Sequence, residues 1–301
     1  MERVKIILNP VAGRGYGAQV EALLRDLLIE QRIKFELQKT EYPGHATSLA
    51  ERAARDGYDL IVAAGGDGTT NEVINGLVGL SNNGRHFSLG LLPVGAGCDF
   101  AYNVGIPTDL PGACRRLVTG KPRPVDLCQV TVDESASIYF SNSVNIGFGG
   151  IVVQEMSKKE NGRGLAPYLS AVFKAAFRSQ PPRVIIEAGE QRLDLSAVMI
   201  CIANGAREGG RFLCAPEAEP DDGAFDMCVV QETSRLNMLA LVPQFMSGKH
   251  TDHKMVTMGR AGHISVSSKD GLIAHMDGEL LCMQARKLDF DILHHEIRVR
   301  C

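Results

Sequence analysis

One short segment, residues 60–72, constrains the fold of this chain more than any other. It begins with an apolar run at residues 60–64 that is typical of a buried parallel strand. The run continues into a glycine-rich turn at residues 65–68, and Thr69 and Glu72 follow with the spacing of a helix capping box. The segment therefore predicts a strand that ends in a tight turn at the start of a helix, as in α/β domains.

The glycine turn has the composition of a phosphate-binding loop. Gly65, Gly66 and Gly68 allow left-handed backbone conformations and a close approach to a ligand. The backbone N–H groups at a helix N-terminus favour an anion such as phosphate. Asp67 would place a carboxylate beside this anion, which is understandable if a cation such as Mg²⁺ lies between them. The alternative is a tight turn with an exposed aspartate.

The composition is that of an ordinary globular protein. The 301 residues are 45% hydrophobic and 22% charged, and this length favours two domains. The formal net charge of -3 gives no basic field, so we expect no nucleic-acid partner. The N-terminus enters a predicted strand directly and no apolar run has the length of a membrane span, so we expect a cytoplasmic protein without a signal peptide. The eight cysteines form no CxxC pair and are expected to be reduced core thiols.

Residues 1–125 alternate between strand and helix signals, which predicts a three-layer α/β domain with a parallel sheet. The expected strands are residues 4–8, 34–38, 60–64 and 88–92. The expected helices are residues 18–30, 46–56, 70–77 and 110–119.

Residues 126–301 are dominated by strand signals, which predicts a mainly antiparallel β domain. The expected strands are residues 138–146, 183–187, 193–203, 225–231, 263–267, 272–275 and 287–293, with turns at residues 221–223 and 269–271. The expected helices are residues 166–178 and 234–246.

A second glycine-rich loop, residues 9–17, separates the first predicted strand from the first predicted helix. It begins with Asn9 and Pro10 and contains Gly13. Its glycines are spaced GxGxG and not GxGxxG as in dinucleotide-binding folds. A nucleotide loop and a plain turn both remain open, and the neighbouring motifs favour the nucleotide loop.

Three aspartates are expected at one edge of the parallel sheet. Asp67 follows one predicted strand, Asp99 follows the next through a loop that contains Gly95, and Asp126 is a third candidate. A single aspartate at a strand end is usually a turn or cap residue. Three on one rim would repel each other, and a bound cation best explains them.

Far along the chain, Asp277-Gly278 is a hairpin signal, and local sequence alone makes the following Glu279 a solvated turn residue.

These motifs together resemble the diacylglycerol kinase catalytic-domain family, which also includes sphingosine and ceramide kinases. The matching positions, in order, are Asn9-Pro10 with Ala12-Gly13, residues 65–69 with Asn71 and Glu72, Pro93 and Gly95 with Asp99-Phe100, and Asp277-Gly278-Glu279. The glycine turn alone is shared with NAD kinases and phosphofructokinases. The resemblance implies an N-terminal α/β domain of the NAD kinase and phosphofructokinase type and a C-terminal β-sandwich domain that takes the lipid substrate.

The resemblance also implies roles for individual residues. ATP is the expected phosphoryl donor, and its binding positions are Asn9, Pro10, Gly13, Thr40, Gly65, Gly66, Asp67, Gly68, Thr69, Thr70, Asn71, Gly95 and Ala96. Asp67, Asp99 and Asp126 match carboxylates of a water-mediated Mg²⁺ network. Glu279 matches the general base, although Asp67 is argued to be the base in some relatives. The Asp222 side chain and the carbonyls of Glu219 and Ala224 match a structural metal loop, for which a charged turn is the plain alternative.

The chain departs from the family in the loop after the fourth predicted strand. Ala96 stands where the family usually has threonine, and Cys98 stands where it usually has asparagine. The loss of such polar contacts would cost on the order of 1 kcal/mol each and would weaken ATP binding without abolishing it.

We therefore expect an ATP-dependent lipid kinase that acts on diacylglycerol or a similar lipid. An NAD kinase-like small-molecule kinase and a non-catalytic lipid- or nucleotide-binding regulator are the alternatives. The sequence leaves the oligomeric state open, with a homodimer among the candidates.

Basic residues gather between residues 158 and 183, where apolar and aromatic residues recur at helical spacing. We expect this segment to dock transiently and peripherally on a membrane surface, or else to be a core helix with a solvated basic face. Its basic residues are Lys158, Lys159, Arg163, Lys174, Arg178 and Arg183.

Overall fold

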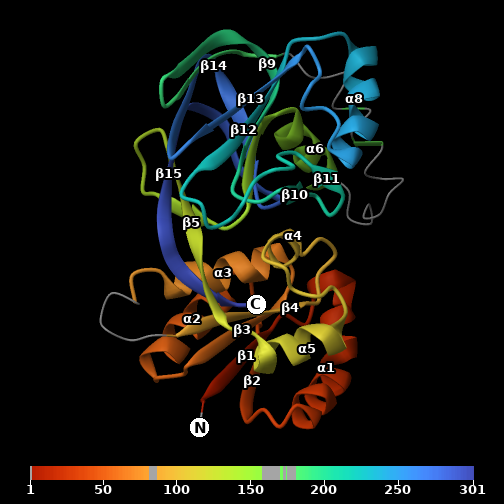
Figure 1. Ribbon diagram of the computed structural model, residues 1–301, viewed down its shortest axis with the longest axis vertical. Coiled ribbons are helices and arrows are strands. Elements are labelled where there is room, and N and C mark those ends of the chain that lie inside the picture. Colours follow the sequence, from red (N-terminus) through yellow and green to blue (C-terminus); the bar gives the residue numbers. More distant parts are fainter. Residues whose placement is uncertain (1, 81–86, 158–169, 172–173, 175–180) are drawn as a thin grey trace. The chain divides into compact units, whose positions relative to one another are not determined.

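The computed structural model describes residues 2–80, 87–157, 170–171, 174 and 181–301, and the chain forms two compact units (Figure 1). The first unit comprises Met1–Leu127, Tyr139–Ser141 and His294–Cys301, and the second comprises Cys128–Ile138 and Asn142–Leu293. The last residues of the chain thus belong to the first unit. A single domain boundary after residue 125 therefore does not describe the two units.

A parallel sheet forms the centre of the first unit. Its strands follow the order β4 (Ser88–Pro93), β3 (Leu60–Gly65), β1 (Val4–Leu8) and β2 (Phe35–Lys39). Every residue of β1 and β3 is buried, as expected for strands that are covered on both faces. The end of β15 (Glu279–Arg300) adds a further parallel partner, because Val299 pairs with Leu89 of β4.

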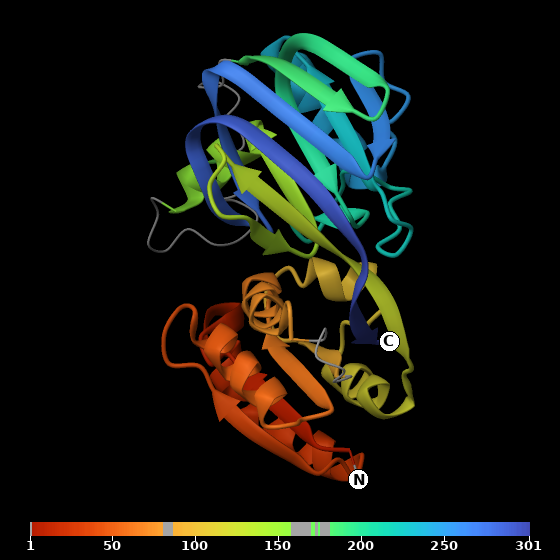
Figure 2. The same cartoon turned by 90° about the vertical axis from the view of Figure 1, so that its left-hand side faces the viewer.

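Helices cover both faces of this sheet, as Figure 2 shows. They are α1 (Ala12–Glu30), α2 (His45–Arg55), α3 (Asp67–Leu77), α4 (Asp99–Asn103) and α5 (Leu110–Thr119). α1 packs with α5, and α2 packs with α3. The three-layer α/β prediction is therefore confirmed.

The helix after the glycine turn is not capped as the sequence predicted. α3 begins at Asp67, two residues before Thr69, and it has no side-chain cap. The Glu72 carboxylate instead accepts hydrogen bonds from Gly44 N (2.9 Å) and Ala46 N (3.0 Å) at the start of α2. The capping-box prediction is wrong, because the packing of α2 against α3 brings Glu72 to the N-terminus of the neighbouring helix.

The second unit is mainly an antiparallel β structure, as predicted. Its sheet follows the order β13 (Val256–Ala261), β12 (Phe225–Gln231), β9 (Gln191–Ala203), β7 (Ser143–Gly147), β14 (His263–Met276) and β15. β8 (Arg183–Ala188) pairs with both β14 and β9, and β10 (Arg207–Glu208) forms a separate hairpin with β11 (Phe212–Leu213). β5 (Pro122–Val132) pairs with β15 and with β6 (Ile138–Phe140).

Three strand predictions in this part of the chain need correction. The expected turn at residues 269–271 does not end a strand, because β14 continues through it with a shift of register between Ser267 and Leu272. The single strand expected at residues 138–146 is divided into β6 and β7. β5 was not predicted at all, since its prolines at residues 122 and 124 are not typical of a strand.

The second unit also contains the helices α6 (Phe148–Ser157) and α8 (Arg235–Ser247). Ser234 caps α8 by accepting a hydrogen bond from Asn237 N at 3.3 Å. Most of the helix predicted at residues 166–178, and most of the proposed membrane-docking segment, lies outside the described residues; Ser170, Ala171 and Lys174 are described and are helical. Of the helices that the structure does describe, none has the length and apolarity needed to cross a bilayer.

Candidate active site

The loops after β1, β3 and β4 meet at the carboxyl edge of the parallel sheet. A Cβ atom added to Gly13 would lie 2.5 Å from Val94 O, and one added to Gly95 would overlap with the backbone of Gly66. Val94 N and Gly95 N both donate to Gly65 O, at 2.9 Å and 3.0 Å. Because the backbones approach this closely only without side chains, the three glycine loops form one continuous surface.

Asn9 connects the first of these loops to the third helix. Its Nδ2 donates to Thr69 Oγ1 at 2.9 Å, and its Oδ1 accepts from Val11 N at 3.1 Å. The backbone then turns sharply, because Gly13, Arg14 and Gly15 all have positive φ angles. The sequence predicted a loop before the first helix. In the structure this loop is a non-helical insertion within the range of α1.

The N-terminus of α3 is the candidate anion-binding element of this edge. No side chain caps this helix, and the uncapped first turn of a helix favours an anion. Thr69 and Thr70 are buried at the start of the helix, and Asn71 is half-buried. Thr40 follows β2 at the same edge and donates its backbone N–H to Leu8 O at 2.9 Å.

Asp67 and Asp99 lie against the same glycine. A Cβ atom on Gly97 would be 3.0 Å from Asp67 Oδ2 and 3.5 Å from Asp99 Oδ2. The other oxygen of Asp67 accepts a hydrogen bond from Phe100 N at 3.1 Å. Two carboxylates beside a space that a Cβ would fill are suitable oxygen ligands for Mg²⁺, so these residues fit the metal that the sequence predicted.

Asp126 has other partners. It is fully buried, and its Oδ1 accepts hydrogen bonds from His294 Nδ1 and His295 N, both at 2.8 Å. The two histidine rings stack with centroids 3.6 Å apart. Sequence reasoning did not find this pair, because more than half of the chain separates the histidines from Asp126. A role for Asp126 in the Mg²⁺ network stays a prediction.

The two positions that depart from the family pattern differ in their surroundings. Ala96 is exposed at the tip of its loop. Cys98 is buried, has a positive φ angle of 50°, and places its Sγ 3.5 Å from Gly65 O. The thiol therefore contacts the glycine turn itself. Cysteine in place of the family's asparagine thus acts on the packing of this loop.

The Asp277-Gly278 turn joins β14 to β15 as a tight hairpin. Both residues have positive φ angles, as a two-residue turn of this kind requires. Asp277 Oδ1 fixes the turn by accepting from Asn142 N at 3.2 Å and Ser143 N at 2.9 Å. The turn thus holds Glu279 in an exposed position at its end.

The predicted structural metal loop contains an ion pair. Asp222 Oδ2 contacts the Arg260 guanidinium, and Asp222 Oδ1 accepts from Ala224 N at 3.1 Å. Burial raises the pKa of nearby Asp226 to about 6. The positive charge of Arg260 partly opposes this rise, and acidic neighbours that include Glu219 add to it. Any cation in this loop would compete with Arg260 for Asp222, and the ligand roles of Glu219, Asp222 and Ala224 stay predictions.

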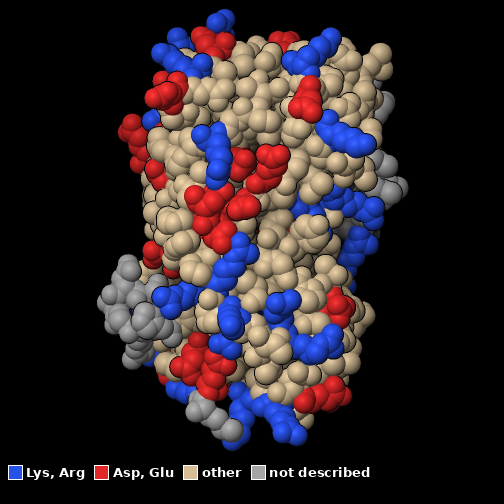
Figure 3. All heavy atoms as spheres, viewed as in Figure 1, with Lys and Arg blue, Asp and Glu red and all other residues tan. Residues whose placement is uncertain are grey.

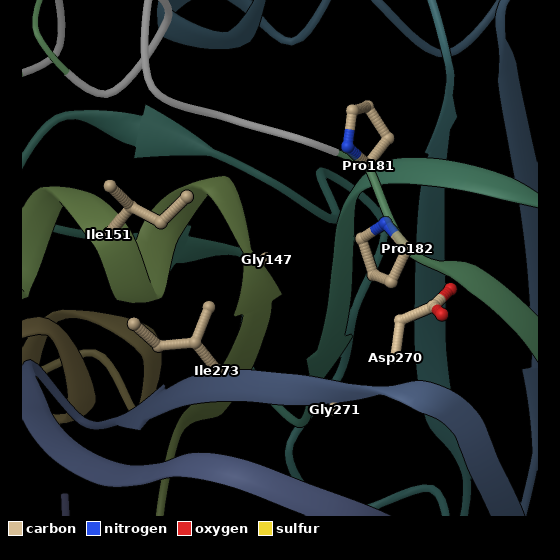
Figure 4. Close-up of a pocket in the computed structure, with 7 residues that line it drawn as sticks. All are labelled: Gly147, Ile151, Pro181, Pro182, Asp270, Gly271 and Ile273. Carbon is tan, nitrogen blue, oxygen red and sulfur yellow. The ribbon is translucent and has the colours of Figure 1, made fainter.

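A pocket of about 340 Å³ lies in the second unit, between α6, β14 and the residues that precede β8 (Figure 4). Ile151 and Ile273 project into it from one side, and prolines border the other. It is lined by Gly147, Ile151, Pro181, Pro182, Asp270, Gly271 and Ile273.

On the face of the molecule that Figure 3 shows, several acidic side chains gather near the middle of the view, and basic side chains gather elsewhere on the same face.

Two family models match the chain. The model described as diacylglycerol kinase catalytic domain matches residues 3–130, and the one described as YegS C-terminal NAD kinase beta sandwich-like domain matches residues 142–297. The chain is 29% identical to a diacylglycerol kinase from Bacillus subtilis, over 93% of this chain and 90% of the relative. It is 30% identical to a diacylglycerol kinase from Staphylococcus saprophyticus, over 92% of this chain and 89% of the relative.

The fold is also found in solved structures. A diacylglycerol kinase from Bacillus anthracis superposes with a TM-score of 0.75 at 22% identity, covering 99% of this chain and 96% of that one. An NAD kinase from Archaeoglobus fulgidus in complex with ATP superposes with a TM-score of 0.52 at 12% identity, covering 99% and 93%. These likenesses agree with the expected NAD kinase-like α/β fold and β-sandwich.

Proposed function

Because the chain belongs to the diacylglycerol kinase catalytic-domain family, we propose that it transfers the γ-phosphoryl group of ATP to the hydroxyl group of a diacylglycerol-like lipid. The family makes the chain an enzyme of the lipid kinase class. The observation that carries the proposal is the meeting of three glycine loops beside the paired carboxylates of Asp67 and Asp99.

The glycine loops bind the phosphates of ATP in this proposal. Phosphoryl transfer requires mainly positioning and neutralisation of charge, which backbone N–H groups supply without reorganisation. The uncapped N-terminus of α3 presents such groups, and the contacts among Gly13, Gly66 and Gly95 keep the three loops in fixed relative positions. The hydrogen bond from Asn9 to Thr69 holds the first loop against this helix.

Asp67 and Asp99 hold Mg²⁺ in the proposed mechanism. When bound, the ion would offset the negative charge that develops on the transferred group. Phe100 N orients Asp67 through one carboxylate oxygen, while the other oxygen remains directed towards Gly97.

Glu279 acts as the general base and accepts the proton of the lipid hydroxyl. Its exposed position at the end of an anchored hairpin supports this role, because a base must reach a substrate group that arrives from solvent or from a membrane. Asp67 is the other candidate for the base.

The acceptor is proposed to be a lipid that is reached at a membrane surface. The pocket lined by Ile151 and Ile273 has the size and partly apolar walls that a segment of an acyl chain requires. An exposed Ala96 in place of threonine supports ATP binding that is weaker than in relatives that keep the hydroxyl group.

The test is an assay with γ-labelled ATP and vesicles or detergent micelles that contain diacylglycerol, sphingosine or phosphatidylglycerol, and a separate arm with NAD. We expect Mg²⁺-dependent transfer of label to a lipid hydroxyl, with diacylglycerol as the preferred acceptor. Transfer to NAD alone would favour the small-molecule kinase. Binding of ATP or lipid without any transfer would favour the non-catalytic regulator.

A further inference from the structure

Four neighbouring strands of the second unit place potential metal ligands and polar groups in one row. Cys228, Cys201, Asn145 and His275 are paired partners on β12, β9, β7 and β14. Directly opposite residues of antiparallel strands project to the same face of a sheet, so the row lies on one face. All four residues are buried. Polar and sulfur-containing side chains in such a row need partners within the protein interior.

The β10–β11 hairpin brings two more side chains over this row. Glu208 Oε1 lies 3.1 Å from His275 Nε2, and Glu208 Oε2 accepts from Asn145 Nδ2 at 3.3 Å and from Cys201 Sγ at 3.5 Å. Cys214 follows β11 directly and is buried as well. The ligand atoms of Cys201, Glu208 and Cys214 all lie within 4.8 Å of one another.

Two buried atoms beside this group lack hydrogen-bond partners within the described part of the chain. They are Asn145 Oδ1 and His275 Nδ1. Gly149 borders the same place, since a Cβ atom there would lie 2.6 Å from Asn145 Oδ1 and 2.9 Å from His275 Nε2. Unsatisfied buried polar atoms are costly, so their position beside two thiols and a carboxylate indicates a missing polar component.

We propose that Cys201, Cys214 and Glu208 bind a zinc ion in the interior of the second unit. Two sulfur ligands and one carboxylate favour Zn²⁺ over the hard cations Mg²⁺ and Ca²⁺. Tetrahedral zinc separates a sulfur ligand from an oxygen ligand by about 3.5 Å, which equals the 3.5 Å between Cys201 Sγ and Glu208 Oε2. Each thiol that binds gives up its proton to solvent as the zinc–sulfur bond forms.

His275 and Asn145 are positioning residues in this site. Each contacts one oxygen of Glu208, and such contacts orient a metal-bound carboxylate. Asn145 Oδ1 is available to accept a hydrogen bond from a water molecule in the fourth zinc position. The zinc ion would join the β10–β11 hairpin to the sheet, so its binding would stabilise the second unit. This inference does not depend on the proposed kinase activity.

The test is the zinc content of the full-length protein, purified without chelators and measured by plasma mass spectrometry. Replacement with cobalt should give a thiolate-to-cobalt charge-transfer band. We expect about one zinc ion per chain, and loss of both zinc and the band in Cys201→Ser and Cys214→Ser. Cys228→Ser is the matched control, because Cys228 lies in the same row but its sulfur is outside the ligand group. Asn145→Ala should weaken zinc binding about 10- to 100-fold.

Three results would overturn the proposal. They are wild-type protein without zinc and without a cobalt band, zinc content that both serine variants retain, and a Cys201–Cys214 disulfide in freshly purified protein. If the serine variants do not fold, the cobalt band of the wild-type protein and its loss to a competing chelator still decide between the outcomes.

Discussion

Asp67 is the side chain on which the proposed chemistry depends most, because it borders both the start of α3 and the space beside Gly97. Asp67→Asn keeps the shape of the side chain but removes its charge, so we expect a loss of most phosphoryl transfer with an unchanged thermal unfolding temperature. The exposed Asp56 provides the control, since Asp56→Asn should leave turnover unchanged. Near-normal turnover of Asp67→Asn would remove Asp67 from the metal site.

Glu279 is proposed to act on the acceptor, and ATP binding should not need it. Glu279→Gln should therefore lower kcat sharply and leave the affinity for ATP unchanged, because a general base acts in the transition state. Steady-state kinetics and calorimetric titration with ATP separate these effects. Glu190→Gln, in the exposed turn between β8 and β9, is a matched hairpin control. A variant impaired only in ATP binding would assign Glu279 to the nucleotide site.

Among single residues, the sequence was informative where the residue follows a strand that the sequence itself predicts. Asp67 and Asp99 could be found because each follows a strand of the same parallel sheet. The partners of Asp126 could not be found, since His294 and His295 reach it only when β15 returns to the first unit. The acceptor of the Asn9 amide, Thr69, likewise depends on the packing of two loops.

Among the elements, the first glycine loop allows a test of the proposal that the three glycine loops bind the phosphates of ATP. Gly13 and Gly15 both have positive φ angles, so an alanine at either position should cost roughly 1–2 kcal/mol of stability. Only at Gly13 would the new Cβ meet Val94 O, whereas nothing lies within 4 Å of a Cβ at Gly15. We therefore expect Gly13→Ala alone to weaken ATP binding in a calorimetric titration. Equal affinities of the two variants would contradict the proposed role of this contact.

The contact of Glu72 with the start of α2 makes a prediction about stability. Removal of a side-chain cap typically costs about 0.5–2 kcal/mol, and Glu72 accepts from two N–H groups of that helix end. Glu72→Ala should lower the free energy of unfolding in urea by this amount. Glu51→Ala, which removes only an exposed ion pair with Arg55, should change it by less than about 0.5 kcal/mol. Equal effects of the two substitutions would contradict the capping role.

The elements that sequence reasoning missed share one physical cause. β14 passes through the Lys269-Asp270-Gly271 segment because partner strands on both sides keep it in the sheet, so local turn signals were overridden. Thr69 and Glu72 have the spacing of a capping box, but the Glu72 carboxylate accepts a hydrogen bond from the start of the neighbouring helix α2. Fully buried strands such as β1 and β3 were predicted well, because their apolar runs need no distant partner to be recognised.

For the whole molecule, the change from alternating strand and helix signals to strand signals predicted both architectures. The return of the chain end to the first unit could not be predicted, because a strand that pairs in two places has no local signature. The pocket of the second unit was also hidden, since residues from separate segments line it. Ile273→Asp should raise the KM for lipid at least several-fold without changing the KM for ATP, because it replaces an apolar side chain that projects into the pocket with a charged one. Steady-state kinetics with both substrates varied would measure this, and an unchanged KM for lipid would remove the pocket from the acceptor site.

Competition between acceptors shows whether the site at the strand ends transfers the phosphoryl group to a lipid. Wild-type protein is incubated with γ-labelled ATP, Mg²⁺, NAD and vesicles that contain diacylglycerol, and the labelled products are separated. We expect the label to enter the lipid fraction as a phosphate monoester, with a kcat/KM for diacylglycerol far above that for NAD. Label found only in the NAD product, or no labelled product at all, would contradict it.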